Sequence, residues 1–278
     1  DIDTMFDALL PDDGKLAEAM RYATIGGGKR LRPLLLTATA AMFGVDRSQA
    51  LRAAAAIEAI HAYSLIHDDL PCMDDDAMRH GKPSAHQAFG EAVAVLAGDA
   101  LQPFAFEVLV DPATSGDPFV RSELVQLLAQ ACGANGMVGG QVLDIDGEGQ
   151  ALDLPAVTRM QQLKTGALLS AAVEMGAALG KVAPEGRTHL KGYARDLGLA
   201  FQIADDLLDH VGDEGKAGKA LRKDASAGKQ TFVALLGADR AREQARMLID
   251  QAVAHLGSYG AEADLLRALA YFTVERDH

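Results

Sequence analysis

The strongest constraint on the fold of this chain is a cluster of carboxylates placed directly after a long apolar segment. Residues 53–66 carry almost no charge, and residues 67–76 then supply five aspartates in ten positions. Like charges repel one another, and burying them without partners is costly, so this stretch destabilises a core unless a cation neutralises it. Carboxylate oxygens that leave room for water and phosphate oxygens suit Mg²⁺ better than Zn²⁺. The sequence therefore predicts a magnesium site at the end of a buried segment.

A second acidic cluster lies at residues 202–209, far along the chain from the first. On a helix, which turns by about 100° per residue, its polar side chains fall on one stripe and leave the apolar ones for packing. One such cluster alone is weak evidence, because solvated helix faces often contain similar strings. Two of them, each joined to an apolar helix, favour two facing walls that clamp a metal-bound diphosphate. The candidate metal ligands are Asp68, Asp69 and Asp74 in the first cluster, and Asp205, Asp206 and Asp209 in the second.

Positive charge is scarce, since the formal net charge is −13, and this argues against nucleic acid or an anionic membrane as the main partner. Three glycines at positions 26–28 precede Lys29 and Arg32, which lie one turn apart where a helix is expected to start. Exposed backbone N–H groups and the helix dipole make such a start attractive to a diphosphate. The alternative interpretation is a solvated basic helix start without a ligand.

Other cations gain meaning only beside the two acidic clusters. Arg79 and His80, which follow the first acidic cluster, can hold a diphosphate or merely compensate the charge of the nearby aspartates. A lone lysine in a helix or in the charged segment 213–228, which is expected to form a loop that closes over the site, is usually a surface residue. These further candidates are Arg79, His80, Lys164 with the neighbouring Thr165, Lys219 and Lys229.

The composition favours a single all-α domain over residues 1–278, because Ala and Leu are abundant and alternating β-branched runs are scarce. The glycine-rich segment 133–140 is expected to let helices approach closely, and residues 146–149 are expected to form a loop. Asp46 or Ser48 is expected to cap the fourth helix. The expected helices cover residues 3–10, 15–24, 29–43, 46–67, 91–109, 117–132, 154–179, 184–212, 231–237, 239–256 and 262–275.

Cysteine content and hydropathy bear on where the chain works. The two cysteines form no readable disulfide framework, which fits a reducing compartment, and we expect the cytoplasm. We expect no transmembrane segment, because no apolar run reaches the ~20 residues that span a bilayer. No signal peptide is visible. Because the chain starts at Asp1, the question of whether a targeting segment was removed stays open.

One histidine motif offers a different metal chemistry. Glu58 and His61 have the E-x-x-H spacing of di-iron helix bundles, but such bundles need two copies and this chain has one. His61 precedes Asp68 by seven residues, which places the two within about 20° of each other around a helix. We therefore interpret His61 as a polar contact on the acid-bearing face rather than as an iron ligand.

Together these residues resemble the trans-isoprenyl diphosphate synthase (polyprenyl synthetase) family, and within it the bacterial members that make the C15 product farnesyl diphosphate. The resemblance extends from about Met20 to Arg276, and seven motifs in the family's order are far more specific than any one of them. The motifs are Gly27–Pro33, the first acidic cluster, Gly139-Gly140-Gln141 with Asp144, Lys164-Thr165-Gly166, Phe201-Gln202 with the second acidic cluster, Gly218-Lys219 with Asp224, and Gly228-Lys229.

The resemblance implies an antiparallel helical bundle around a deep central cavity, usually as a homodimer, and Mg²⁺-dependent head-to-tail condensation of isopentenyl diphosphate with an allylic diphosphate. About three Mg²⁺ ions, which Mn²⁺ can replace, are expected on the allylic diphosphate. The implied roles are metal ligation by Asp68, Asp74 and Asp205, allylic diphosphate binding by Arg79, Lys164, Lys219 and Lys229, isopentenyl diphosphate binding by Lys29, Arg32 and His61, and contact of Thr165 and Gln202 with the allylic cation.

Two positions bear on substrate affinity and product length. The family usually has Arg-Arg where this chain has Arg79-His80, and an imidazole binds the second diphosphate more weakly above its pKa of about 6.5. The segment 219–224 also departs from the family pattern. Tyr63, with Ser64 beside it, lies five residues before Asp68 and so about 7.5 Å deeper along the helix. A ring there is expected to stop the growing chain at C15.

Other functions remain open at this point. The same chemistry with a C10 or C20 product needs only a different cavity floor. A class I terpene cyclase also uses acidic metal clamps, but it does not need Lys29 and Arg32 for a second diphosphate. A non-catalytic partner subunit of a heteromeric synthase typically lacks one acidic cluster, whereas this chain has both.

Overall fold

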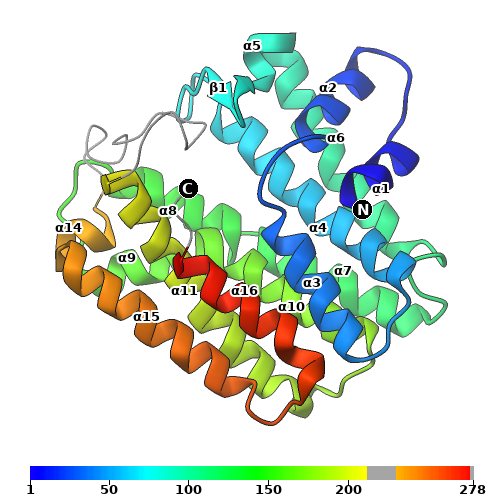
Figure 1. The fold of residues 1–278 in the computed structure, drawn as a ribbon. Helices are drawn as coiled ribbons and strands as arrows, with labels where there is room; N and C mark the ends of the chain where they lie inside the picture. The colour runs from blue at the N-terminus through cyan, green and yellow to red at the C-terminus, as the bar shows by residue number, and fades with distance from the viewer. Residues whose placement is uncertain (212–229, 276–278) are drawn as a thin grey trace.

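The computed structural model describes residues 1–211 and 230–275, with the side chain of Val211 left out, and this part of the chain is almost entirely helical (Figure 1). The prediction of an all-α fold is confirmed. The elements are α1 (Ile2–Leu9), α2 (Lys15–Thr24), α3 (Leu31–Met42), α4 (Arg47–Asp68), β1 (Met78–Arg79), β2 (Lys82–Pro83), α5 (Ala85–Phe89), α6 (Glu91–Val110), α7 (Pro118–Cys132), α8 (Met137–Gly147), α9 (Leu154–Gln161), the π-helical turn η1 (Gln162–Gly166), α10 (Ala167–Leu179), the 3₁₀ turn η2 (Pro184–Arg187), α11 (Thr188–Val211), α14 (Phe232–Leu236), α15 (Ala238–His255), the 3₁₀ turn η3 (Ala261–Ala263) and α16 (Asp264–Glu275).

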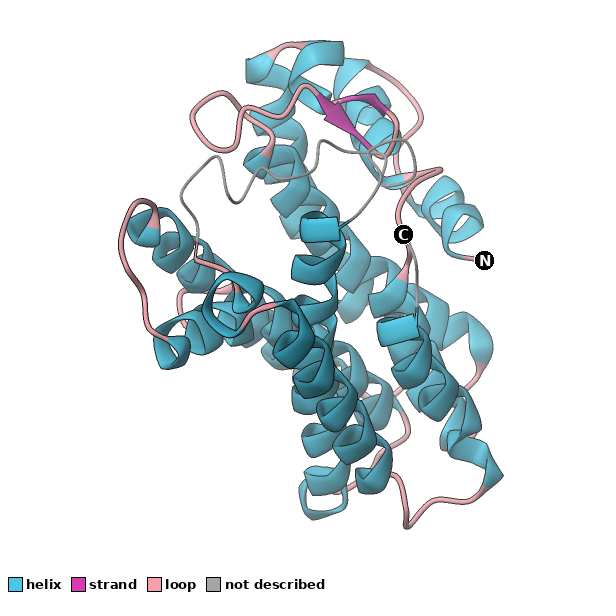
Figure 2. Cartoon of the chain, turned by 60° about the vertical axis from the view of Figure 1, so that its left-hand side comes forward, coloured by secondary structure: helices cyan, strands magenta, loops and turns pink. Residues whose placement is uncertain are grey.

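Helix α4 is the central element, and it ends at the first acidic cluster. Asp46 caps its start, because the carboxylate accepts hydrogen bonds from the backbone N–H groups of Ser48 and Gln49. Its middle is buried on nearly every side, as the apolar run predicts, and it packs against α3, α6 and α10. Figure 2 shows these long helices side by side, with the short hairpin at one end of the molecule. The buried run therefore fixes the position at which the acidic residues emerge.

Helix α6 corrects the expectation that no apolar run is long enough to span a membrane. It has 20 residues and a mean hydropathy of 1.6, and by length and composition alone it meets the requirement for a span. Packing accounts for its apolar character, since it lies against α2, α4, α5 and α7. Seven of its eight buried residues form part of the main core.

The expected helix over residues 154–179 is interrupted by a π-helical turn, and the segment before it is more helical than expected. Residues 162–166 form η1, which carries Lys164 and Thr165. Helix α8 covers 137–147, so the expected loop at 146–149 is wrong for residues 146 and 147, whereas residues 148 and 149 form a turn as expected. Close packing at glycine explains the arrangement, because a Cβ at Gly140 would come within 2.2 Å of the backbone nitrogen of Lys164. The expectation of close helix approach at 133–140 is confirmed.

A two-stranded hairpin follows the first acidic cluster and was not expected. Met78 pairs with Pro83, and Arg79 with Lys82. The two residues of its turn, His80 and Gly81, have φ values of 50° and 75°. Positive φ at both central positions is typical of a type I′ turn, whose twist matches that of the strands it joins. The hairpin therefore places His80 at its tip and Arg79 directly beside the turn.

Candidate functional site

The first acidic cluster is a compact turn at the end of α4. The backbone N–H of Asp74 donates to the carbonyl oxygen of Asp68 at 2.8 Å, which brings these two aspartates together across the five intervening residues. Burial raises the pKa of Asp68 to about 6; Asp74 and Asp69 add to the rise, and Lys164 and Arg79 oppose it. Lys164 belongs to a different part of the chain, so its charge reaches the first acidic cluster from η1.

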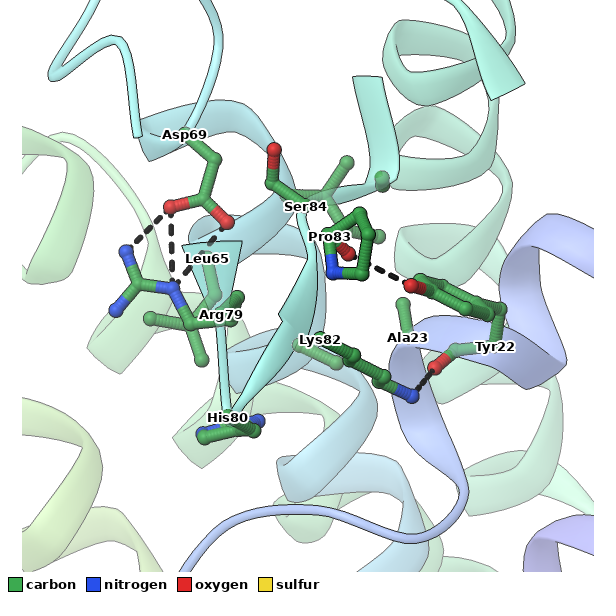
Figure 3. Close-up of a pocket in the computed structure, with 12 residues that line it drawn as sticks. Tyr22, Ala23, Leu65, Asp69, Arg79, His80, Lys82, Pro83 and Ser84 are labelled. Carbon is green, nitrogen blue, oxygen red and sulfur yellow. Dashed lines mark hydrogen bonds and ion pairs between the residues drawn. The ribbon is translucent and has the colours of Figure 1, made fainter. Parts of the chain in front are cut away.

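Asp69 is buried and is bound to Arg79. Its residue surface is 2% exposed, and Nε of Arg79 donates to both of its carboxylate oxygens, at 3.0 and 3.2 Å, with Nη2 of Arg79 also in contact (Figure 3). Asp76 holds the same guanidinium at 3.3 Å. The structure thus joins a candidate metal ligand to a candidate diphosphate-binding residue, and the acidic turn fixes the orientation of Arg79.

The glycine-rich segment before α3 is pinned in place by one arginine. Arg30 has a φ of 53°, and its guanidinium donates to Glu58 at 2.9 Å and to Asp3 at 2.7 Å. Glu58 is buried on α4, so this ion pair ties the segment to the central helix. Analysis of the sequence missed this role, although Glu58 stands out as a charge within the apolar run 53–66. Lys29 is exposed beside Arg30.

Two candidate residues from different segments meet at this glycine segment. A Cβ at Gly27 would come within 2.8 Å of Nδ1 of His80, so the hairpin tip lies directly against the backbone of the segment. The pKa of His80 is lowered to about 4, mainly by burial and in part by the charges of Arg79, Arg30 and Lys82. The imidazole is therefore neutral near pH 7 and is surrounded by cations.

Arg32 and His61 complete this cationic region. Nε of Arg32 is buried and has no hydrogen-bond partner among the described residues. Burial lowers the pKa of Arg32, while the negative charges of Glu58 and Asp205 partly offset that effect. His61 has a pKa well below its ordinary value, because it is buried and lies near Arg32, His80 and other arginines. A buried guanidinium with an unused donor indicates an anion-binding site.

The second acidic cluster lies on the C-terminal half of α11. Asp205 and Asp209 are half-buried, whereas Asp206 is buried. Gln202 donates to Asp206 at 2.9 Å and accepts from the hydroxyl of Thr165 at 3.1 Å. The stripe predicted by helical periodicity is therefore divided, since one of its carboxylates faces inward.

Lys164 lies on η1 between the two clusters. Its ammonium group donates to the buried carboxylate of Asp144 on α8, at 2.6 Å. A π-helical turn often marks a functional site, because the extra residue changes which side chains face inward. Here the turn aims Lys164 at Asp68 and Thr165 at Gln202. The charge of Lys164 on η1 thus acts on Asp68 at the end of α4, and the charge of Asp205 on α11 acts on Arg32 on α3.

The donor set fits Mg²⁺ that is shared with a diphosphate. In residues 1–211 and 230–275, no three His, Cys, Asp or Glu side chains are close enough to hold a metal ion by themselves. Carboxylates on two separate walls, next to a guanidinium with an unused donor, suit an ion that takes its remaining oxygens from phosphate and water. Lys219 and Lys229, with the expected loop at 213–228, lie outside the described residues.

The residues expected to set product length lie deeper along α4. Tyr63 is buried and packs edge to face on His67, with ring centroids 5.7 Å apart. Burial raises the pKa of Tyr63 to about 12, and the neighbouring Cys132 and Asp68 contribute. Ser64 donates its hydroxyl hydrogen to the carbonyl oxygen of His61 at 2.9 Å, so its polar atom is engaged with its own helix.

Comparisons with known proteins identify the family and the fold. The chain matches the polyprenyl synthetase family over residues 13–269. It is 47% identical to the farnesyl diphosphate synthase of Escherichia coli (strain K12), a match that covers 98% of this chain and 93% of the relative. The crystal structure of an FPP/GFPP synthase from Zymomonas mobilis is 54% identical, with a TM-score of 0.89 and coverage of 98% and 94%. A geranyltransferase from Helicobacter pylori, complexed with magnesium and isoprenyl diphosphate, is 31% identical, with a TM-score of 0.87 and coverage of 98% and 92%.

Proposed function

The chain belongs to the polyprenyl synthetase family, and on that premise we propose that its two acidic walls join isopentenyl diphosphate head to tail (1′–4) with dimethylallyl and then geranyl diphosphate. The chain is a prenyltransferase of the farnesyl diphosphate synthase type, with farnesyl diphosphate (C15) and diphosphate as products. One observation carries this proposal: the charge of the Lys164 ammonium acts on the Asp68 carboxylate, and the charge of the Asp205 carboxylate acts on the Arg32 guanidinium.

The allylic diphosphate is held between α4, the hairpin and η1. Arg79, fixed by Asp69, and Lys164, fixed by Asp144, place two cations at this position. About three Mg²⁺ ions, or Mn²⁺ ions in their place, would be held by the carboxylates of Asp68, Asp74, Asp205 and Asp209. The bound metal would supply the positive charge that stabilises diphosphate as a leaving group. Lys219 and Lys229 are proposed to complete this binding.

Isopentenyl diphosphate is held by the glycine segment and its neighbours. Arg32 offers its unpartnered Nε, while Lys29, His61 and His80 surround the same position. A planar guanidinium donates two parallel hydrogen bonds to a phosphate, which fixes both position and orientation. The two diphosphates are thus bound on adjacent sides of one site, with their hydrocarbon tails directed together.

Bond formation requires dry surroundings and acceptor atoms. The oxygens of Thr165 and Gln202 lie between the walls and stabilise the allylic cation that forms when the C1–O bond breaks. Exclusion of water prevents that cation from being quenched. The double bond of isopentenyl diphosphate attacks C1, and the released diphosphate accepts the proton that is then lost.

We propose that Tyr63, with Ser64 beside it, ends chain growth at C15, since a buried ring on α4 blocks deeper extension. Incubation of the purified chain with Mg²⁺, isopentenyl diphosphate and dimethylallyl, geranyl or farnesyl diphosphate, each separately, tests this. We expect C15 from the first two and no extension of the third. A C20 product would support the longer-chain alternative, turnover of an allylic substrate alone would indicate a cyclase, and no product from any of them would indicate a partner subunit.

We also propose that the chain works in the cytoplasm as a homodimer. Several large apolar side chains are exposed on two helices: Val95 and Leu96 on α6, and Val138, Val142 and Ile145 on α8. Exposed apolar groups of this kind favour association with a second copy. A molar mass of about twice 29.2 kDa in sedimentation equilibrium would support the dimer.

A further inference from the structure

A chain of hydrogen bonds runs from the site into the core. The hydroxyl of Thr165 donates to Oε1 of Gln202 at 3.1 Å, and Nε2 of Gln202 donates to Oδ1 of Asp206 at 2.9 Å. The other carboxylate oxygen of Asp206 accepts from the backbone N–H of Phe232 at 2.8 Å, where α14 begins. Thr165 and Gln202 are half-buried, whereas Asp206 is 4% exposed.

The direction of every bond in this chain follows from Asp206. A carboxylate only accepts hydrogen bonds, so Gln202 must turn its NH₂ group toward Asp206 and its carbonyl oxygen toward Thr165. The hydroxyl of Thr165 then uses its single proton on that carbonyl oxygen. The hydroxyl oxygen of Thr165 and the carbonyl oxygen of Gln202 then have only lone pairs left for further interactions. Both oxygens therefore carry partial negative charge with no proton left to present.

We propose that Asp206 is a positioning residue that fixes this polarity, so that Thr165 and Gln202 present lone pairs to the allylic cation. The inference rests on the proposed function, because it needs a cation to form beside these oxygens. Dipoles that are oriented before the reaction need no reorganisation when charge develops, and this is why their orientation matters for rate. Asp206 acts through Gln202, in place of the metal ligation that its spacing alone suggests.

Replacement of Asp206 by Asn keeps the shape and reverses the polarity. The backbone N–H of Phe232 only donates, so the carbonyl oxygen of Asn at position 206 must face it and the new NH₂ must face Gln202. The amide of Gln202 then flips and turns its NH₂ toward Thr165. With D206N we expect kcat to fall by at least about tenfold, as for other oriented dipoles. We expect KM for both diphosphates to change less than about threefold, since no diphosphate contact is removed.

A charge-conserving swap separates polarity from structural support. In Q202E/D206N, the new carboxylate at position 202 accepts from Asn at position 206 and from Thr165, which restores the original direction. We expect the swap to recover kcat to within about tenfold of the parent. Asp196→Asn is the matched control, because Asp196 is another buried carboxylate on α11, bound to Arg195 and His255. Circular dichroism and thermal unfolding of all variants accompany the kinetics.

The outcomes decide the inference. Parental kcat in D206N, or a folded swap that is no faster than a folded D206N, would overturn it. If D206N does not fold, the swap is compared with the parent. A folded swap that loses more than about a hundredfold in kcat would then also overturn the inference. A parent protein that catalyses no condensation would overturn the proposed function, and this inference with it.

Discussion

The imidazole of His80 lies directly against the backbone of Gly27, so that a side chain at position 27 would meet Nδ1 of the ring at 2.8 Å. This contact joins the hairpin tip to the glycine segment before α3. It brings a histidine to the place where the family pattern has a second arginine. It also means that the proposed isopentenyl diphosphate site is built from two separate stretches of chain that must stay in contact.

Substitution of Gly27 by Ala tests that contact. The added methyl group pushes the hairpin tip away, and we expect KM for isopentenyl diphosphate to rise by roughly three- to tenfold, as the loss of one good hydrogen bond would cause. KM for geranyl diphosphate should stay within about twofold. Gly116→Ala is the control, because a Cβ at Gly116 meets nothing within 4 Å. Equal kinetics for both variants would show that the contact has no role in substrate binding.

Substitution of His80 by Arg adds a permanent positive charge beside the glycine segment. A charge-assisted hydrogen bond to phosphate strengthens binding, so we expect KM for isopentenyl diphosphate to fall by roughly three- to tenfold. Backbone strain does not offset this gain, because position 80 has a φ of 50° and the parent histidine, like arginine, is a non-glycine residue there. His80→Gln is the control without charge and should leave KM unchanged at pH 7.5. A higher KM in H80R would contradict the proposed site.

The depressed pKa of His80 predicts a pH dependence of stability. An unfolded histidine binds its proton below about pH 6.5, whereas folded His80 does so only near pH 4. The unfolded state therefore takes up more protons in this window, and stability falls as the pH drops from about 6.5 to 4. Urea unfolding at pH 7.5 and 5 should show that H80Q loses less stability than the parent. A parent and variant with equal losses would mean that His80 titrates normally.

Substitution of Lys164 by Met removes the cation that acts on Asp68 from η1. We expect kcat/KM for geranyl diphosphate to fall by about a hundredfold or more, in line with the loss of an electrostatic contact to a leaving group. Asp144→Asn should give a smaller loss in the same direction, because it leaves the ammonium group in place without its partner. Lys181→Met is the surface control, since this lysine is exposed and its ammonium group bonds only to Asp117 among the described residues. Lys164→Met with parental kcat/KM would remove Lys164 from the mechanism.

Substitution of Tyr63 by Ala opens space below the first acidic cluster. We expect products longer than C15, because the buried ring no longer stops the growing chain. Chromatography of the dephosphorylated products separates C15, C20 and C25. Tyr271→Ala serves as the control, since Tyr271 is exposed on α16. An unchanged product length in Tyr63→Ala would assign the floor of the site to other residues.

Local signals in the sequence were sufficient to predict the positions of most of the helices. Alanine-rich segments, proline at the starts of α7 and α9, and the Asp46 cap give boundaries close to those observed. The π-helical turn at 162–166 was not predicted from the local sequence, and in the structure it packs closely against Gly140 of another helix. The hairpin left only a weak signal, the His80-Gly81 pair at its turn, and its strands have two residues each.

Residue types identified the site better than they assigned roles within it. Spacing placed six aspartates in two clusters but could not distinguish neighbours that differ by one position. Asp68 and Asp205 face the site, whereas Asp69 and Asp206 face inward and hold Arg79 and Gln202. That division depends on which side of each helix is covered by other segments. The Arg30–Glu58 ion pair was missed for the same reason, since it joins segments 28 residues apart.

The central claim is that the walls carrying Asp68 and Asp205 act on one metal-bound diphosphate. Calorimetric titration of the parent, D68N, D205N and the double variant with inorganic diphosphate, with Mg²⁺ and with EDTA, tests it most directly. With Mg²⁺ we expect each single variant to bind at least about tenfold more weakly, and the double variant to lose clearly less than the sum of the two free energies, because interacting sites are not additive. With EDTA all four should bind weakly and alike. Additive losses that persist in EDTA would contradict the account.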